Sequence, residues 1–297
     1  MSILMVLLVR DEEDIVYENL MFHLEMGVDH IIATDNGSDD RTRDILAEFE
    51  RLGVMTLIDE PGRDHSQWRW VTRMARMARD VFDATWIIPN DADEFWLPTG
   101  GSYRAVLENF GADVLKCHRF NMVGAYSDSD QAPWYETVRY RIAKPIEAQV
   151  PKNYLNETID HPHFYRALDG KVLVKARHLK YIREGNHSAV FDREVIQQET
   201  DSVVVYHFPV RSRSQFESKI TNTAVSYSRN TELPTNIGWH QRRWYHLLKS
   251  KGLEESFRAA VPTEDQFNKD VASGILIEDS EIGRILGKFP GRISEFT

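Results

Sequence analysis

The sequence of 297 residues contains a single cysteine, Cys117, and no long hydrophobic run. One cysteine excludes an intrachain disulfide and a zinc site built from several cysteines, and it fits a reducing compartment. The N-terminal apolar run, Ile3 to Val9, has seven residues, whereas a membrane-spanning helix needs about 20. Arg10-Asp11-Glu12-Glu13 follows it, in place of the small residues of a signal-peptide cleavage site. We therefore expect a cytoplasmic protein.

Positive charge is also scarce. The sequence has 36 Lys and Arg residues against 46 Asp and Glu residues, which gives a formal charge of −10. Nucleic-acid binding relies on Lys and Arg to neutralise phosphates, so this balance argues against a general nucleic-acid binder. Apolar residues make up 42% of the chain. That fraction and this length indicate a large core, in one domain or in two closely joined domains.

The first 90 residues alternate between strand and helix patterns. Apolar runs predict strands at 3–9, 28–34, 54–58 and 85–88, and helical periodicity predicts helices at 14–26, around 45–52 and at 66–82. Gly27 and Gly53 are expected to end the first two helices, and Ser38 or Asp39 to cap the second. Such alternation predicts right-handed crossovers and a mostly parallel sheet flanked by helices, that is, an α/β fold.

The rest of the chain is less regular. Strand patterns occur at 113–119, 137–142, 171–176 and 203–207. Helical patterns return at Ser212, which has capping-box spacing to Gln215, and again at 238–251. The second of these helices is basic and aromatic. It either lies on an anionic membrane surface or, as we favour, packs its aromatic side chains inside the protein.

The ends of the predicted parallel strands carry polar or acidic residues. Ligands of parallel sheets bind at the carboxyl ends of the strands. Here these ends are Arg10-Asp11, Asp35-Asn36, Asp59-Glu60 and Asp91-Ala92-Asp93. We therefore expect an acidic ligand-binding rim. Asp35 or Asn36 can hydrogen-bond a base or ribose, with Arg10 and Asp11 lining the same pocket; the alternative is a glycine turn with helix-capping charges.

Asp91-Ala92-Asp93-Glu94 is the sharpest signal on this rim. In an extended segment Asp91 and Asp93 point the same way and Glu94 points elsewhere. Two converging carboxylates suit Mg²⁺ or Mn²⁺, and Mg²⁺ is commonly held by carboxylates together with substrate phosphates. The alternative is a solvated acidic turn, because a bare Asp-x-Asp is common.

Four segments, in this order, resemble glycosyltransferase family 2-like enzymes, in particular the family 92-like branch. They are Leu8–Glu13, Phe22–His30 with its His-x-x-x-Gly-Val-x-His pattern, Asp35–Asp40 and Asp91–Phe95. The resemblance covers roughly residues 3–97. It implies a GT-A fold, a nucleotide-sugar donor (a UDP-sugar favoured), a divalent metal (Mn²⁺ or Mg²⁺) and inversion at the transferred sugar. The acceptor would be a hydroxyl of a glycan, a lipid or a small molecule.

The resemblance also implies a functional division of the chain. Residues 1–112 would form the nucleotide-sugar-binding half of the GT-A domain, residues 113–210 its acceptor-side half, and residues 211–297 a helical region. The metal ligands would be Asp91, Asp93 and His207, with Asp91 meeting the ribose or a metal-bound water. Donor-binding residues would be Val9, Arg10, Asp11, Asp35, Asn36, Arg73, Asp91, Ala92, Arg211 and Lys219.

Some of these assignments have plain structural alternatives. His207 can be an ordinary hydrogen-bonded histidine, and Arg211 and Lys219 can belong to a basic helix face. The catalytic base is left open among Glu157, Asp160, Glu184 and Asp192. We favour Glu184, which precedes Gly185-Asn186-His187, and expect Asp93 to serve catalysis through the metal. His187 and Glu94 would lie on the acceptor side, although the 184–187 segment can also be a surface turn.

Two rival functions remain. One is a sugar nucleotidyltransferase or another metal-dependent nucleotide enzyme, although Arg10-Asp11-Glu12-Glu13 lacks the glycines of a phosphate-binding loop after the first strand. The other is a non-catalytic protein that keeps the fold and binds a nucleotide sugar. Identification of the phosphate product that is released distinguishes a glycosyltransferase from these two rivals.

Overall fold

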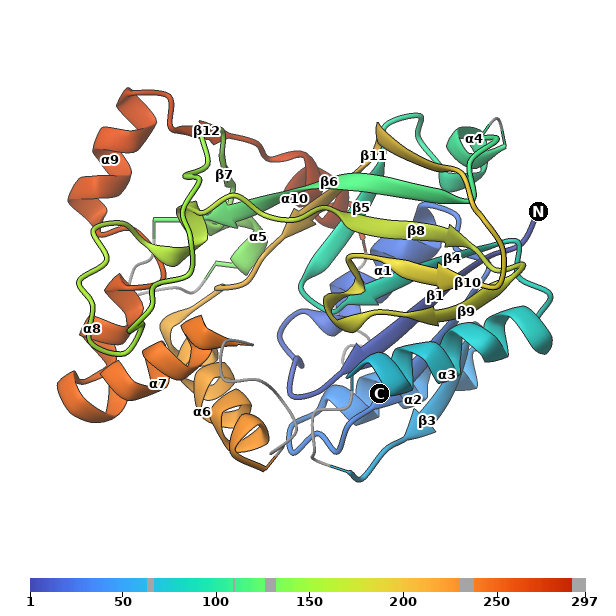
Figure 1. Ribbon diagram of the computed structural model, residues 1–297, viewed down its shortest axis with the longest axis horizontal. Helices are drawn as coiled ribbons and strands as arrows, with labels where there is room; N and C mark the ends of the chain where they lie inside the picture. Colours follow the sequence, from blue (N-terminus) through green and yellow to red (C-terminus); the bar gives the residue numbers. More distant parts are fainter. Residues whose placement is uncertain (63–66, 109, 126–131, 230–237, 290–297) are drawn as a thin grey trace. The chain divides into compact units, whose positions relative to one another are not determined.

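The computed structural model describes residues 1–62, 67–108, 110–125, 132–229 and 238–289. The chain forms two compact units (Figure 1). Unit 1 comprises Met1–Arg119, Asp169–His207 and Ile285–Thr297, and unit 2 comprises Phe120–Leu168 and Phe208–Arg284. The functional division of the chain at residues 112 and 210 stays a prediction.

Unit 1 contains the alternating strands and helices of the N-terminal region and a later set of strands. Its elements are β1 (Ile3–Val9), α1 (Val16–Glu25), β2 (His30–Asp35), α2 (Thr42–Arg51), β3 (Met55–Asp59), α3 (Gln67–Asp80), β4 (Trp86–Asp91), β5 (Glu94–Pro98), α4 (Tyr103–Leu107), the first part of β6 (Val114–Val123), β8 (Lys171–Lys175), β9 (Leu179–Ile182), the 3₁₀ turn η2 (Glu184–Asn186), β10 (Ala189–Phe191) and β11 (Gln197–His207).

The sheet of unit 1 has the strand order β6-β8-β4-β1-β2-β3. The four strands β4, β1, β2 and β3 are parallel, and β8 and β6 extend the sheet antiparallel. In register, Val9 pairs with Asp35 and Asp35 with Asp59, while Leu8 pairs with Asp91. The polar strand ends therefore lie along one edge of the sheet, as the sequence predicts. Strand β11 joins this sheet through β6 and also pairs antiparallel with β5, whereas β9 and β10 form a separate two-stranded sheet.

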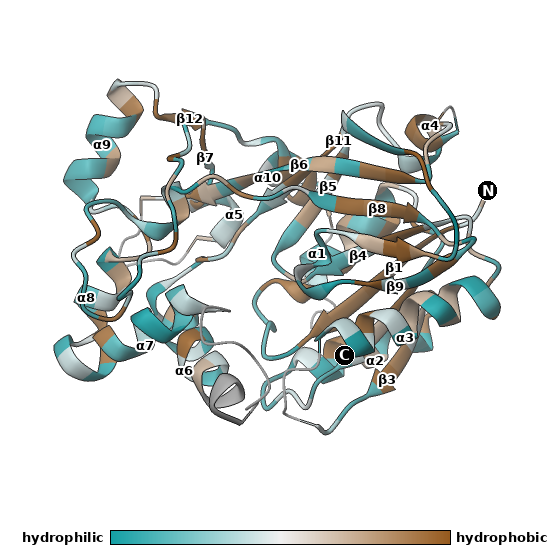
Figure 2. Cartoon of the chain, in the orientation of Figure 1, coloured by the Kyte–Doolittle hydropathy of each residue, from teal (hydrophilic) through white to brown (hydrophobic). Residues whose placement is uncertain are grey.

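Both faces of the parallel sheet are buried, which explains why β1 is continuously apolar. Ile3, Met5 and Leu7 belong to a core shared with α1, α2 and α4, whereas Leu4 and Val6 pack with α3. Figure 2 shows the hydrophobic colouring concentrated on β1 and its neighbouring strands. The predicted α/β fold with helices on both faces is thus confirmed.

The boundaries of the elements differ from prediction at two informative places. The α2 helix begins at Thr42 and has no side-chain cap. The predicted cap at Ser38 or Asp39 is wrong, because Ser38 Oγ donates to Asp35 Oδ1 instead, at 2.5 Å. The β4 strand extends to Asp91 rather than ending at Ile88, so the acidic motif begins inside the sheet.

Unit 2 is mainly helical. Its elements are the end of β6, α5 (Trp134–Thr137), β7 (Tyr140–Ile142), the 3₁₀ turn η1 (His163–Tyr165), α6 (Arg213–Arg229), α7 (Trp239–Lys251), α8 (Leu253–Arg258), α9 (Glu264–Ala272), β12 (Leu276–Glu278) and most of α10 (Glu281–Leu286). The β6 end pairs with β7, and β7 pairs with β12.

The core of unit 2 takes up the aromatic side chains of α7. Trp244 packs with Phe164, Phe216 and Phe257, and Trp239 is also buried. The packing interpretation of this helix is therefore confirmed for both tryptophans. At the start of α6, Ser212 Oγ accepts from the backbone N–H of Gln215 at 3.1 Å, so the predicted cap is present. No helix in the described part of the chain has the length and apolar character needed to cross a membrane.

Candidate active site

The Asp-Ala-Asp-Glu segment forms the tight turn between β4 and β5. Asp91 is the last residue of β4 and Glu94 the first of β5, so Ala92 and Asp93 make the turn. Because the chain reverses here, the alternation of an extended strand does not apply. Asp91 Oδ2 and Glu94 Oε1 both contact Lys171 Nζ, at 2.5 and 3.0 Å. The expectation that Glu94 points away from Asp91 is therefore wrong.

A chain of buried amide side chains fixes the backbone of this turn. Asn19 of α1 donates from Nδ2 to the carbonyl oxygens of Ala92 and Glu94, at 3.0 and 2.8 Å. Its Oδ1 accepts from Asn90 Nδ2 at 2.9 Å, and Asn90 Oδ1 in turn accepts from Trp96 Nε1 at 2.8 Å. The shape of the turn is thus set by α1 and by the adjoining strands.

Lys171 is the central cation of the cluster. It is the first residue of β8, and only 2% of its side chain is exposed. It occupies one oxygen of Asp91, while Asp91 Oδ1 accepts from Gln67 Nε2 at 3.2 Å and from Asn186 Nδ2 at 3.3 Å. Both oxygens of Asp91 are therefore hydrogen-bonded within the protein.

Glu94 has a second cationic partner. Arg119 Nη1 lies 2.9 Å from Glu94 Oε1. Burial alone would raise the pKa of Glu94, but the charges of Lys171 and Arg119 hold that pKa below its usual value. For Asp91, burial raises the pKa despite the opposing charge of Lys171, and the neighbouring Glu94 adds to this rise. The two pKa values shift in opposite directions because Glu94 contacts two cationic side chains, Lys171 and Arg119, whereas Asp91 contacts Lys171.

Asp93 lies at the tip of the turn next to His207. Strands β5 and β11 pair so that His207 is opposite Glu94. Asp93 Oδ2 and His207 Nε2 are 3.5 Å apart, and their side chains are 10% and 15% exposed. The sequence prediction that places these two residues together agrees with this geometry.

A carboxylate oxygen beside an imidazole nitrogen fits a divalent cation such as Mn²⁺. Among the described residues, no group of three or more His, Cys, Asp or Glu side chains is arranged to hold a metal ion. A cation at Asp93 and His207 would thus need further ligands from a substrate, which is how Mg²⁺ is commonly bound at phosphate sites. Both oxygens of Asp91 already accept hydrogen bonds, which a cation at that carboxylate would have to displace.

The segment 184–187 contacts the same cluster. Asn186 is 1% exposed and donates to Asp91, so the surface-turn interpretation is wrong for this residue. Glu184 Oε2 accepts from the backbone N–H of Trp68 at 3.3 Å. His187 Nδ1 lies 3.0 Å from the carbonyl oxygen of Gly170. Burial, with the charges of Lys171 and Arg119, lowers the pKa of His187 to about 4, so its imidazole is neutral at pH 7.

The residues predicted to bind the nucleotide base and the ribose lie together where β1 and β2 end. The backbone N–H of Asn36 donates to the carbonyl oxygen of Val9 at 2.9 Å. Asp11 accepts on Oδ1 from the backbone N–H of Asp39 at 2.7 Å, and Arg10 Nε lies 3.3 Å from Asp11 Oδ2. The structure therefore brings Val9, Arg10, Asp11, Asp35 and Asn36 together at one end of the sheet.

Arg73 reaches the same end from α3. Its Nη1 lies 3.2 Å from Glu60 Oε2, and the carbonyl oxygen of Glu60 accepts from Asn36 Nδ2 at 3.1 Å. Arg73 is thus near the strand ends but is engaged by a carboxylate.

A sequence model of glycosyltransferase family 92 matches residues 7–238. The chain belongs to glycosyltransferase family 92. It is therefore a glycosyltransferase, and its mostly parallel sheet, covered by helices on both faces, is the GT-A fold expected of it. Comparison with curated proteins gives no match.

Several solved structures resemble this family 92 chain at low identity. TarS 1-349 of S. aureus has 13% identity and a TM-score of 0.44, covering 93% of this chain and 80% of TarS. Glucosyl-3-phosphoglycerate synthase from Mycobacterium tuberculosis, solved with Mn²⁺, UDP and glucosyl-3-phosphoglycerate, has 16% identity and a TM-score of 0.27, covering 40% of this chain and 44% of the synthase. HddC from Yersinia pseudotuberculosis has 11% identity and a TM-score of 0.37, covering 73% and 97%.

The remaining predicted residues of this glycosyltransferase lie apart from the cluster or in unit 2. Asp192 Oδ1 lies 2.9 Å from His178 Nδ1 in unit 1. In unit 2, Glu157 accepts from the backbone of Asn153, and Asp160 contacts His161. Arg211 and Lys219 also belong to unit 2, where Arg211 is 2% exposed and donates to the carbonyl oxygen of Phe208 at 3.0 Å.

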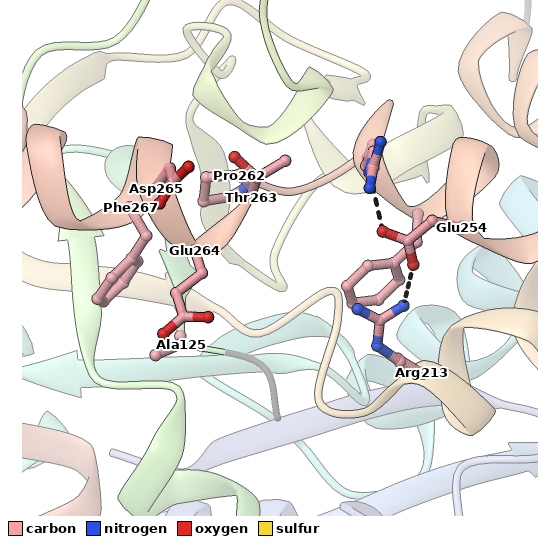
Figure 3. Close-up of a pocket in the computed structure, with 11 residues that line it drawn as sticks. Ala125, Arg213, Glu254, Pro262, Thr263, Glu264, Asp265 and Phe267 are labelled. Carbon is pink, nitrogen blue, oxygen red and sulfur yellow. Dashed lines mark hydrogen bonds and ion pairs between the residues drawn. The ribbon is translucent and has the colours of Figure 1, made fainter. Parts of the chain in front are cut away.

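Unit 2 contains a polar cavity of about 570 Å³ (Figure 3). On one side Glu254 lies between two guanidinium groups, 2.6 Å from Arg213 and 2.8 Å from Arg258. Figure 3 shows Glu264 and Asp265 on the other side. This lining offers hydrogen-bond donors as well as acceptors, which suits a hydroxyl-rich ligand.

Sequence reasoning missed the residues that hold the acidic turn. They are Asn19, Gln67, Asn90, Arg119, Lys171 and Asn186. One signal could have indicated Lys171, because a lysine opens the otherwise apolar stretch that continues through Val174. A charge at the start of a buried strand needs a partner of opposite sign.

Proposed function

We propose that this glycosyltransferase transfers a sugar from a nucleotide-diphosphate donor, a UDP-sugar by preference, to an acceptor hydroxyl with inversion and with the help of Mn²⁺ or Mg²⁺. The acceptor is a glycan, a lipid-linked sugar or a small molecule. The observation that carries the proposal is the pairing of Asp93 with His207 at the end of β4, in a chain of family 92. We place the reaction in the cytoplasm, which the lone Cys117 fits.

The chain's own residues divide the work of the reaction. Asp93 and His207 would hold the cation, which supplies positive charge to the departing diphosphate. Arg10, Asp11, Asp35 and Asn36, gathered at the ends of β1 and β2, would bind the nucleoside part of the donor.

The proton of the acceptor hydroxyl needs a base. We propose Glu184, supported by its position two residues before Asn186, which contacts Asp91. As the acceptor oxygen bonds to the anomeric carbon, the bond from that carbon to the diphosphate oxygen breaks, and Glu184 takes the proton. A positioned base contributes roughly 10²–10⁴-fold to the rate, so Glu184→Gln should slow transfer by a factor in that range.

The first test is donor turnover. Purified protein is incubated with a panel of nucleotide sugars and acceptors, with Mn²⁺ or with EDTA. We expect nucleotide diphosphate to be released only with metal. Asp93→Asn should lower the rate more than about 100-fold, because charge stabilisation at the leaving group is lost. Asp80→Asn, at an exposed carboxylate on α3, is the matched control and should keep full activity.

The products also separate the rival functions. Release of pyrophosphate from a nucleoside triphosphate and a sugar 1-phosphate, supplied in a parallel reaction, would indicate a nucleotidyltransferase. Binding of the nucleotide sugar without turnover on any acceptor would indicate a non-catalytic protein. NMR of the product's anomeric proton tests inversion. Equal activity in EDTA and in Mn²⁺ would refute metal dependence.

A further inference from the structure

The start of α3 and the end of β9 form an aromatic pair at the surface of unit 1. Trp68 is 43% exposed, and the ring of Tyr181 lies 6.2 Å from its ring, centroid to centroid, at 63°. An arginine accompanies each ring: Arg69 Cζ lies 5.5 Å from the centroid of Trp68, and Arg183 Cζ lies 5.6 Å from that of Tyr181. We call these residues the aromatic-arginine patch. Exposed aromatic rings beside arginines are typical of binding surfaces.

The two arginines of the patch differ from the other arginines of α3. Arg73 and Arg79 pair with carboxylates, and Arg76 donates to a carbonyl oxygen of β9. Both Arg69 and Arg183 are exposed, and within the described ranges no carboxylate or carbonyl oxygen bonds to their guanidinium groups. The patch therefore presents two positive charges that no nearby carboxylate neutralises, on a chain whose formal charge is −10.

Hydrogen bonds fasten the patch to the acidic turn. The backbone N–H of Trp68 donates to Glu184 Oε2 at 3.3 Å. The preceding residue, Gln67, accepts on Oε1 from the backbone N–H of Gly185 at 3.3 Å and donates from Nε2 to Asp91 at 3.2 Å. A base must lie within hydrogen-bond reach of the hydroxyl that it deprotonates. A ligand held by the patch is therefore placed beside Glu184, where the acceptor hydroxyl has to lie.

We propose that the aromatic-arginine patch binds the acceptor, and that this acceptor is a saccharide carrying a phosphate or a carboxylate group. This inference rests on the proposed function, in which Glu184 is the base. The indole of Trp68 would stack on the apolar C–H face of a sugar ring. The guanidinium groups of Arg69 and Arg183 would bind the anionic group, because their planar fork matches the oxygens of a carboxylate or a phosphate.

The contacts between the arginines and the rings favour this role. A guanidinium group that packs on an aromatic ring keeps its charge and is held in a restricted set of orientations. Less side-chain freedom is then lost when an anion binds, which favours affinity. The two rings and the two cations therefore act together as one preorganised surface for an anionic sugar.

Binding of matched sugars to the full chain tests the patch. Titrations followed by the NMR signals of the ligand use methyl glucoside, methyl glucuronide and glucose 6-phosphate, which differ chiefly in charge. Wild type should bind at least one charged sugar about 10-fold more tightly than methyl glucoside, because hydrogen bonds to a charged group are strong. The tighter of the two charged sugars shows whether the patch prefers a carboxylate or a phosphate. Equal binding of all three, or binding of none, would overturn the inference.

Variants of the patch locate the binding. Arg69→Gln and Arg183→Gln should each weaken binding of the preferred charged sugar about 10-fold, and Trp68→Ala should weaken binding of every sugar about 5-fold. Arg69→Lys should recover only part of the loss, since lysine keeps the charge but not the fork. Arg51→Gln is the matched control, because it removes an equal charge at a 74% exposed arginine of α2 and should bind as wild type does. A loss in Arg51→Gln as large as that in Arg69→Gln would show a general charge effect and refute the patch.

Turnover separates this inference from the proposed function. With the preferred charged sugar as acceptor, Arg69→Gln should raise the KM for the acceptor about 10-fold and leave the KM for the nucleotide sugar unchanged. A rise in the donor KM alone would assign the patch to the diphosphate of the donor and overturn the inference. If charged sugars bind through the patch but no nucleotide diphosphate is released, the patch stands as a sugar-binding site and the proposed function fails. If wild type and Arg69→Gln glycosylate neutral and charged acceptors equally well, the proposed function stands and this inference fails.

Discussion

At the scale of single residues, Asn19 controls the acidic turn through hydrogen bonds alone. It is fully buried, donates to the carbonyl oxygens of Ala92 and Glu94, and accepts from Asn90. A buried polar group that loses its partner costs about 1–3 kcal/mol. One asparagine therefore supplies the hydrogen-bond partner of three polar groups next to the proposed cation site.

Replacing this residue should damage the fold and the site together. We expect Asn19→Leu to lower the free energy of unfolding by about 2–4 kcal/mol, because three polar groups lose a partner. Mn²⁺ binding should weaken too, since Asp93 is held by the same turn. Urea denaturation measures the loss of stability, and a Mn²⁺ titration followed by the EPR signal of the aqueous ion measures the loss of binding.

The control for this change is Asn121→Leu in unit 2. Asn121 is also buried, and it donates to the carbonyl oxygen of Phe164 at 2.8 Å. Its replacement should lower stability but leave Mn²⁺ binding intact in the protein that remains folded. If Asn19→Leu also keeps wild-type Mn²⁺ binding, the turn does not depend on Asn19.

At the scale of elements, the 3₁₀ turn η2 depends on the backbone of Gly185. Its φ is +73°, and an added Cβ would lie 2.7 Å from the imidazole Cδ2 of His187. The neighbouring Asn186 is the residue that reaches Asp91. A side chain at position 185 therefore meets both backbone strain and a steric clash beside the site.

Gly53 offers a matched comparison. Its φ is +77°, but an added Cβ would meet no atom within 4 Å. We expect Gly53→Ala to cost about 1 kcal/mol from backbone strain, and Gly185→Ala to cost about 1–2 kcal/mol more, with reduced transfer activity. Thermal unfolding and donor turnover measure both. Equal losses in the two variants would show that the contact with His187 is unimportant.

The elements were predictable from sequence to the extent that they obey local rules. The continuous apolar run of β1 predicted a strand covered on both faces, and the periodicity of Val71, Met74 and Ala78 predicted α3. The cap at Ser38 failed because the helix begins only at Thr42 and the Ser38 hydroxyl donates to Asp35, three residues earlier in the chain.

The site was predictable only where it is continuous in sequence. The acidic motif and its place at a strand end could be located, and so could the group of Asp35 and Asn36. The orientation of Glu94 could not, because it follows from a reversal of the chain and from Lys171, 77 residues further along. Interactions between distant strands have no local signature in one sequence.

At the scale of the whole molecule, buried histidines couple stability to pH. His23 is fully buried, with Nδ1 2.7 Å from the carbonyl oxygen of Asn19 and Nε2 3.4 Å from the backbone nitrogen of Trp96. Burial lowers the pKa of His23 from 6.5 to about 4. Burial and nearby cations lower the pKa of His187 to a similar value.

The direction of the effect follows from these shifts. Between pH 6.5 and about 4 the unfolded chain binds a proton at His23 and the folded chain does not. Stability is therefore fully present above pH 6.5 and is lost as pH falls through this window. One pKa unit corresponds to about 1.4 kcal/mol, so His23 alone should remove about 2 kcal/mol between pH 7 and pH 5.

Denaturant titrations at pH 7, 6 and 5 measure this loss. His23→Gln cannot titrate, so its free energy of unfolding should fall by about 2 kcal/mol less than that of wild type over the same range, even though its stability at pH 7 is lower. His246→Gln, at an exposed histidine of α7, should keep the wild-type dependence. If wild type and His23→Gln lose stability in parallel, His23 is not the group that couples folding to pH.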